Sequence, residues 1–152
     1  MIIADTGFLS SLLKIDKLNL IFKALEIKEV VITGAVLNEL KKASFYRKIS
    51  HFINSNKIIV KYVEAKVIEN FGHGELESIQ LAIENDALLL IDDRKVAKFA
   101  EAKGVNTINL PGFLFYCKNK LLSKKEILEI IKELKNNDYY EFSEEVKLAL
   151  LN

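Results

Sequence analysis

The stretch LLLIDDRKVAKFAEAKGV, residues 88–105, combines the two periodicities that decide the fold. Its first four residues are apolar and indicate a buried strand, whereas RKVAKFAEAKG, 94–104, has the period of a basic amphipathic helix that ends at a glycine suited to a C-cap. Two adjacent aspartates, Asp92 and Asp93, stand between strand and helix. Aspartate is a good N-cap, but only one of two neighbours can take that position, so the second requires another explanation.

Short apolar runs alternate with longer stretches of helical period in both directions from this segment. Further strands are predicted at 1–5, 30–33, 58–63 and 105–110. Strands separated by helices of about ten or more residues indicate βαβ units and hence a parallel sheet. We therefore predict an α/β fold, a three-layer α/β/α arrangement around a central, mainly parallel sheet of four to five strands.

The composition fits one domain in a reducing compartment. The 152 residues include one proline and six glycines, which leaves no room for a flexible linker. We expect a single domain, 1–152, with 111–152 as a helical C-terminal extension packed on it. The lone cysteine excludes an internal disulfide, and we see neither a signal-peptide pattern nor an apolar run near the ~18 residues of a membrane span. A cytoplasmic protein without membrane contact is expected.

Aspartates follow two of the predicted strands, Asp5 after the first and the Asp92–Asp93 pair after the fourth. Open parallel sheets bind ligands at the carboxyl ends of their strands, near the point where the strand order reverses. For a single strand-end aspartate, capping of the next helix is an equally good explanation. The adjacent pair favours a ligand-binding role.

Two glutamates border the apolar stripes of predicted helices. In HGELESIQLAIEND, 73–86, Glu75 lies at the edge of the stripe, whereas Glu77 lies on the polar face and is expected to be solvated. In GAVLNELKKA, 34–43, Glu39 borders the stripe in the same way. Charged residues are rarely held near a core without a partner, and a nearby lysine or arginine would also satisfy them.

The resulting set contains carboxylates and neither histidine nor cysteine: Asp5, Glu39, Glu75, Asp92 and Asp93. Such ligands suit hard cations, Mg²⁺ or Mn²⁺, bound through oxygen. Clustered carboxylates repel one another unless a cation neutralises them or their pKa values rise. Carboxylate-bound Mg²⁺ commonly serves phosphoryl transfer, in which the metal activates water and stabilises charge on the phosphate. The set therefore predicts phosphoryl chemistry, provided that the five residues converge in space.

The motifs resemble those of the PIN domain, the fold of metal-dependent ribonucleases that includes the VapC-type toxins of toxin–antitoxin pairs. The resemblance runs over nearly the whole chain. IIADTGFLSSLL, 2–13, is similar to the opening motif of the family and implies Asp5 as a metal ligand with Thr6 as its support. VVITGAVLNELKK, 30–42, resembles the second motif and places Glu39 in its acidic position.

The most specific part of the resemblance is GHGELESIQLAIEND followed by ALLLIDDRKVAKFAEAKGV, 72–105. It is similar to the branch described as predicted nucleic-acid-binding, PIN-containing proteins. The third acidic position falls on Glu75 and the fourth on Asp92 or Asp93. Of this pair we expect Asp93 to be the ligand and the other carboxylate to cap a helix or to support the site.

The resemblance implies a metal-dependent endoribonuclease that hydrolyses RNA phosphodiester bonds. The expected catalytic residues are Asp5, Glu39, Glu75 and Asp93, and the expected cofactor is Mg²⁺ or Mn²⁺, with Asp92 as a further candidate ligand. A homodimer, and a toxin role with a separately encoded antitoxin, are further implications. The alternative is a non-catalytic module of PIN fold that binds RNA or a protein.

Basic residues adjoin the acidic motifs although the chain as a whole is nearly neutral, with 22 Lys and Arg against 21 Asp and Glu. Lys41 and Lys42 follow Glu39, and Arg94 and Lys95 follow Asp93. Phosphate contacts supply most nonspecific affinity for nucleic acid, so these residues are candidates for holding RNA. Solvated helix faces that balance acidic neighbours would have the same pattern.

Overall fold

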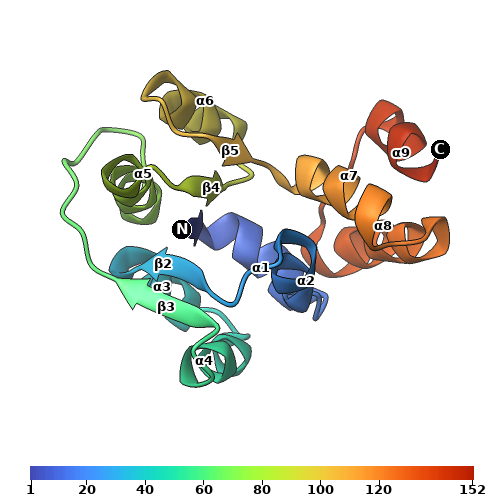
Figure 1. Ribbon diagram of the computed structural model, residues 1–152, viewed down its shortest axis with the longest axis horizontal. Helices are drawn as coiled ribbons and strands as arrows, with labels where there is room; N and C mark the ends of the chain where they lie inside the picture. The colour runs from blue at the N-terminus through green and yellow to red at the C-terminus, as the bar shows by residue number, and fades with distance from the viewer.

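A five-stranded, all-parallel sheet in the order β3-β2-β1-β4-β5 forms the centre of the computed structural model, which covers residues 1–152 (Figure 1). The strands are β1 (Ile2–Ala4), β2 (Val30–Thr33), β3 (Ile58–Lys61), β4 (Leu88–Leu90) and β5 (Thr107–Ile108). β1 lies in the middle, and the chain crosses from one half of the sheet to the other between β3 and β4. The strand order therefore reverses beside β1, where parallel sheets bind ligands.

Nine helices surround the sheet: α1 (Thr6–Lys14), α2 (Asn19–Leu25), α3 (Gly34–Lys41), α4 (Tyr46–Asn54), α5 (His73–Asn85), α6 (Arg94–Ala102), α7 (Leu110–Lys120), α8 (Lys124–Asp138) and α9 (Glu144–Leu151). The predicted three-layer α/β/α fold is confirmed. None of these helices is both long enough and apolar enough to span a bilayer.

Alternate residues of the central strands face opposite layers of helices. Ile3 and Leu89 belong to a smaller apolar cluster formed with residues of α5 and α6. Their neighbours Ala4 and Leu90 belong to a cluster of 27 buried residues that includes residues of the other seven helices. This alternation is the period of two that an extended strand imposes. The core therefore consists of two apolar layers separated by the sheet.

Four of the five predicted strands are shorter in the structure, most of all the last one. The strand predicted at 105–110 is reduced to Thr107–Ile108, because the Asn109 side chain accepts the Gly112 N–H at 2.8 Å and caps α7. Pro111, whose φ is already helical, occupies the first turn of that helix. The strand predicted at 58–63 ends at Lys61, which leaves Tyr62 exposed beyond it.

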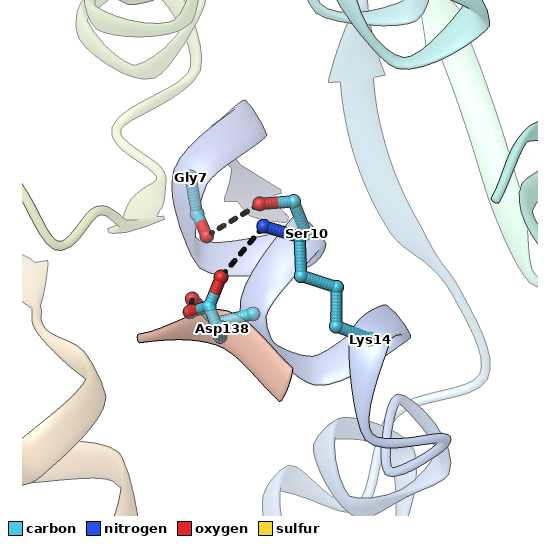
Figure 2. Close-up of polar contacts among 5 residues, drawn as sticks. Gly7, Ser10, Lys14 and Asp138 are labelled. Carbon is cyan, nitrogen blue, oxygen red and sulfur yellow. Dashed lines mark hydrogen bonds and ion pairs between the residues drawn. The ribbon is translucent and has the colours of Figure 1, made fainter. Parts of the chain in front are cut away.

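The C-terminal helices lie at one end of the molecule, beside α1 and α2 and away from the loop that joins β3 to α5 (Figure 1). Asp138, the last residue of α8, fixes them to α1. One of its carboxylate oxygens accepts the Ser11 hydroxyl at 2.6 Å, and the other accepts the Lys14 ammonium at 2.7 Å. Figure 2 shows this ion pair together with the Ser10 hydroxyl, which donates to the Gly7 carbonyl. The helix that follows Asp5 is thereby tied to the end of α8.

Asp138→Ala should lower the free energy of unfolding by about 1–3 kcal/mol, because the buried Ser11 hydroxyl would lose its acceptor. Chemical denaturation measures this change. The control is Glu144→Ala, which removes an exposed partner of Lys147 and is expected to change stability by less than about 1 kcal/mol. Equal effects of the two substitutions would contradict an anchoring role for Asp138.

Candidate metal centre

Asp5 follows the central strand and is buried at the carboxyl edge of the sheet, with 7% of its surface exposed. Its backbone N–H donates to the Leu90 carbonyl at 2.9 Å, which continues the pairing of β1 with β4. Asp5 occupies the N-cap position of α1, yet its side chain makes no capping hydrogen bond. Its Oδ1 is buried without any hydrogen-bond partner. An unpartnered buried carboxylate oxygen is costly, and a cation would satisfy it.

Three of the other acidic residues act on Asp5 electrostatically. Burial raises the pKa of Asp5 to about 7, the backbone N–H of Thr6 opposes this rise, and the charges of Glu39, Glu75 and Asp93 add to it. These residues come from α3, α5 and the entry to α6. We call the four residues Asp5, Glu39, Glu75 and Asp93 the carboxylate centre. The chain thus brings together four of the five acidic residues chosen from the sequence.

Glu39 is held by the start of α1. The Thr6 hydroxyl donates to Glu39 Oε2. From the sequence we assigned Thr6 to the support of Asp5: its backbone N–H lowers the pKa of Asp5, whereas its hydroxyl is used by Glu39. Gly74 brings α5 close to the same side chain, since a Cβ at Gly74 would lie 2.7 Å from Glu39 Oε1. The missing side chain at Gly74 therefore sets how closely α3 and α5 approach around the centre.

Glu75 and Glu77, both on α5, have different partners. Glu75 is half-buried, and its Oε2 accepts the N–H of Gly72, just before the helix, at 2.8 Å. Glu77 is also half-buried, and its Oε1 accepts the Ala35 N–H at 3.1 Å. The prediction that Glu77 is a solvated surface charge is therefore wrong. The N-terminus of α3 offers unpaired N–H groups and a positive dipole end, and these explain why the carboxylate lies there.

Asp92 and Asp93 divide their roles. Asp93 is exposed and caps α6, because its Oδ1 accepts the Val96 N–H at 3.1 Å. Asp92 is half-buried, and its Oδ1 accepts both the Leu110 N–H at 2.9 Å and the Tyr140 hydroxyl at 3.1 Å. Asp93 is the member of the pair whose charge acts on Asp5. Asp93 is therefore both the helix cap and the member of the pair that raises the pKa of Asp5. Asp92 instead connects the centre to the C-terminal helices.

The donor set of the carboxylate centre fits a hard divalent cation. Glu39, Glu75 and Asp93 each use one carboxylate oxygen in a hydrogen bond to the protein, and Asp5 Oδ1 has no partner. No three Asp, Glu, His or Cys side chains lie close enough as positioned to enclose an ion, so simultaneous ligation requires side-chain movement. Oxygen donors alone, with repulsion that a cation would relieve, match the preference of Mg²⁺ and Mn²⁺.

The predicted RNA-binding residues are all exposed but differ in their surroundings. Lys42 lines a cleft that also contains Glu39, and Arg94 lines a second cleft that contains Asp92. Lys95 lies over the ring of Phe71, with its Nζ 5.2 Å from the ring centroid. Lys41 lines neither cleft. Lys42 therefore shares a cleft with a member of the carboxylate centre, whereas Arg94 shares one with Asp92, the neighbour of Asp93.

Comparison with known proteins identifies the family and the fold. A family model described as a PIN domain matches residues 1–151. A PilT N-terminus domain protein from the hyperthermophilic archaeon Sulfolobus solfataricus P2 is similar in structure, with a TM-score of 0.54 and 23% identity over 81% of this chain and 96% of that one. The PIN domain endonuclease Utp24 also has a TM-score of 0.54, with 20% identity over 72% of this chain and 84% of that one. None of the curated proteins matches the chain in sequence.

The stability of the metal-free protein should fall as pH rises. The pKa of Asp5 is about 7 in the folded state against an ordinary 3.8, so between these values the folded state binds more protons than the unfolded state. The lost stability is at most about 4 kcal/mol, incurred above pH 3.8 and complete above pH 7. Denaturation in EDTA at pH 5 and pH 8 measures the difference. Asp5→Asn should remove it and stabilise the metal-free protein at pH 8.

The matched control for this experiment is Asp86→Asn. Asp86 is exposed and has a φ of 49°, a conformation that asparagine tolerates, so its replacement should leave the pH dependence unchanged. An Asp5→Asn protein that keeps the full pH dependence of the wild type would show that another group is responsible.

Tyr140→Phe should lower the free energy of unfolding by about 0.5–1.5 kcal/mol, because Asp92 would lose one of its two donors. Tyr139→Phe alters the neighbouring, almost fully exposed tyrosine and should have no measurable effect. Denaturation curves of the two variants side by side test the contact. Identical curves would show that the Tyr140–Asp92 hydrogen bond adds nothing to stability.

Proposed function

The chain belongs to the PIN-domain family, and on that premise we propose that it is a Mg²⁺- or Mn²⁺-dependent endoribonuclease that hydrolyses RNA phosphodiester bonds. The observation that carries the proposal is the buried, unpartnered Oδ1 of Asp5 among three further carboxylates. Such a group of charges is destabilising in the absence of a cation, and oxygen-bound divalent metals serve phosphoryl transfer. The similar endonuclease Utp24 supports a nuclease role.

Asp5, Glu39, Glu75 and Asp93 would hold the metal, which when bound supplies an activated water and stabilises charge on the phosphate. Asp5 must lose its proton to serve as a ligand, so metal and proton compete at this residue near neutral pH. Thr6 orients Glu39, and the N-terminus of α6 orients Asp93. These contacts hold two of the carboxylates in place before a metal arrives.

Lys42 and Arg94 would hold the RNA backbone on the two sides of the carboxylate centre. A polyanion is repelled by four carboxylates, and flanking cations offset that repulsion. Lys42 lines a cleft together with Glu39 of the carboxylate centre. Arg94 lines a cleft together with Asp92, the neighbour of Asp93. Lys41 and Lys95 would contribute to the basic surroundings.

The alternative is a non-catalytic PIN-fold module that binds RNA or a protein. One observation favours it: no three potential ligands lie within reach of a common ion without side-chain movement. The buried, unpartnered oxygen of Asp5 outweighs this point, because a binding module has no need to bury an uncompensated carboxylate.

We further propose that residues 1–152 form one domain, because α7, α8 and α9 contribute to the same apolar cluster as β1 and α1. A cytoplasmic location, a homodimer, and a toxin role with a separately encoded antitoxin are part of the proposal, and they rest on the family resemblance alone.

Cleavage of labelled single-stranded RNA by the purified protein, with Mg²⁺, Mn²⁺ or EDTA, tests the function. Asp5→Asn should reduce metal-dependent cleavage by at least about 100-fold, since loss of even a supporting residue of a metal site costs up to that much. Glu84→Gln is the control, because Glu84 is exposed on α5 and bonds to Gln80 only. Mg²⁺ should also raise the melting temperature of the wild type but not that of Asp5→Asn.

RNA that binds but is never cleaved, together with a melting temperature that does not respond to either metal, would replace the nuclease with the non-catalytic module. Equal cleavage by wild type and Asp5→Asn would remove the carboxylate centre from the mechanism.

A further inference from the structure

A cleft of about 480 Å³ adjoins the carboxylate centre on the side of α3. It lies between α3, the start of α5 and the segment that follows β3, and Glu39 lines it. Its volume falls within the range of small-molecule sites in proteins. Because Glu39 belongs to both, a group bound in the cleft would lie next to the reacting phosphate of the proposed function.

Tyr62 projects from the cleft wall with 81% of its surface exposed. A Cβ built on Gly34 would lie 2.6 Å from Cδ1 and Cε1 of the ring but 3.8 Å from Cγ. These distances place an edge of the ring, rather than a face, against Gly34. One edge of the ring thus lies against Gly34 while most of its surface stays accessible, as base stacking requires.

The charges of the cleft favour an uncharged aromatic group over a phosphate. Two carboxylates, Glu39 and Glu77, line it together with one lysine, Lys42, and the imidazole of His73. Glu77 already accepts a backbone N–H at 3.1 Å and so stays fixed in the wall. A phosphate held between Glu39 and Glu77 would meet net repulsion, whereas a planar base would meet the ring of Tyr62 and leave Lys42 free to contact a neighbouring phosphate.

We propose that this cleft is a nucleobase subsite, in which one unpaired base of the RNA stacks on Tyr62 while its phosphate lies toward Glu39 and the metal centre. Tyr62 then acts as a positioning residue that sets which phosphate enters the centre. The inference rests on the proposed nuclease function, and it requires a base that is free of a duplex at that position.

The test uses a short single-stranded RNA with the fluorescent base 2-aminopurine at successive positions, first in EDTA and then with Ca²⁺ in place of Mg²⁺. Stacking quenches this base, so one position should be quenched more than the others on binding. Tyr62→Ala should abolish that quench and weaken binding about tenfold. Tyr62→Phe should retain both the quench and the affinity, because stacking needs the ring and not the hydroxyl.

Gly34→Ala moves the ring without removing it. The new Cβ would lie 2.6 Å from the ring, so the side chain of Tyr62 must shift. Alanine suits the first residue of α3, where φ is not positive, so the melting temperature should not fall. Loss of the position-specific quench with an unchanged melting temperature is the expected result. Tyr46→Ala, a partly exposed tyrosine of α4 outside the cleft, is the control and should bind as the wild type does.

Two outcomes separate this subsite from the function on which it rests. Equal affinity and equal quenching in wild type, Tyr62→Ala and Gly34→Ala, with metal-dependent cleavage intact, would overturn the subsite alone. No binding of any RNA by the wild type in EDTA or Ca²⁺, with no cleavage in Mg²⁺, would overturn both.

Discussion

A carboxylate with one oxygen buried and unpartnered, at the end of the central strand, is the constraint on which the rest of the structure depends. Asp5 follows β1, which lies between β2 and β4 with a layer of helices on each face. Folds usually place a cation beside such a charge or leave it accessible to solvent. Here the neighbouring elements contribute three more carboxylates. The carboxylate centre therefore destabilises the metal-free protein, and such departures from local rules are common at functional sites.

The residues at the starts of the helices that follow strands also set Asp5 apart. Thr33, Asp93 and Asn109 stand between a strand and the following helix, and the side chain of each accepts a backbone N–H of that helix. Asp5 stands at the equivalent place after β1, and its side chain makes no capping hydrogen bond. One aspartate in a series of working caps is thus left free, and it is the one buried at the point where the strand order reverses.

The pattern of apolar residues was enough to predict the sheet. Short apolar runs indicated the buried strands, and stretches of helical period indicated the helices between them. The same patterns placed the aspartates at strand ends and Glu39 and Glu75 beside apolar stripes, but they could not show that these residues converge. They failed where a contact depends on how closely two helices approach. The hydrogen bond from Thr6 to Glu39, the place of Glu77 at the start of α3, and the edge contact of Tyr62 all follow from packing around Gly34 and Gly74, and no local period encodes these.

The contact between Tyr140 and Asp92 joins two residues that are synthesised far apart in time. The carboxylate centre begins with the fifth residue of the chain, yet the hydroxyl that holds its neighbour Asp92 comes from the loop after α8. A ribosome makes the chain in that order, so the acidic residues are all present long before the last of their supports. For a protein proposed to cut RNA, the four carboxylates are therefore synthesised before the hydroxyl that supports Asp92.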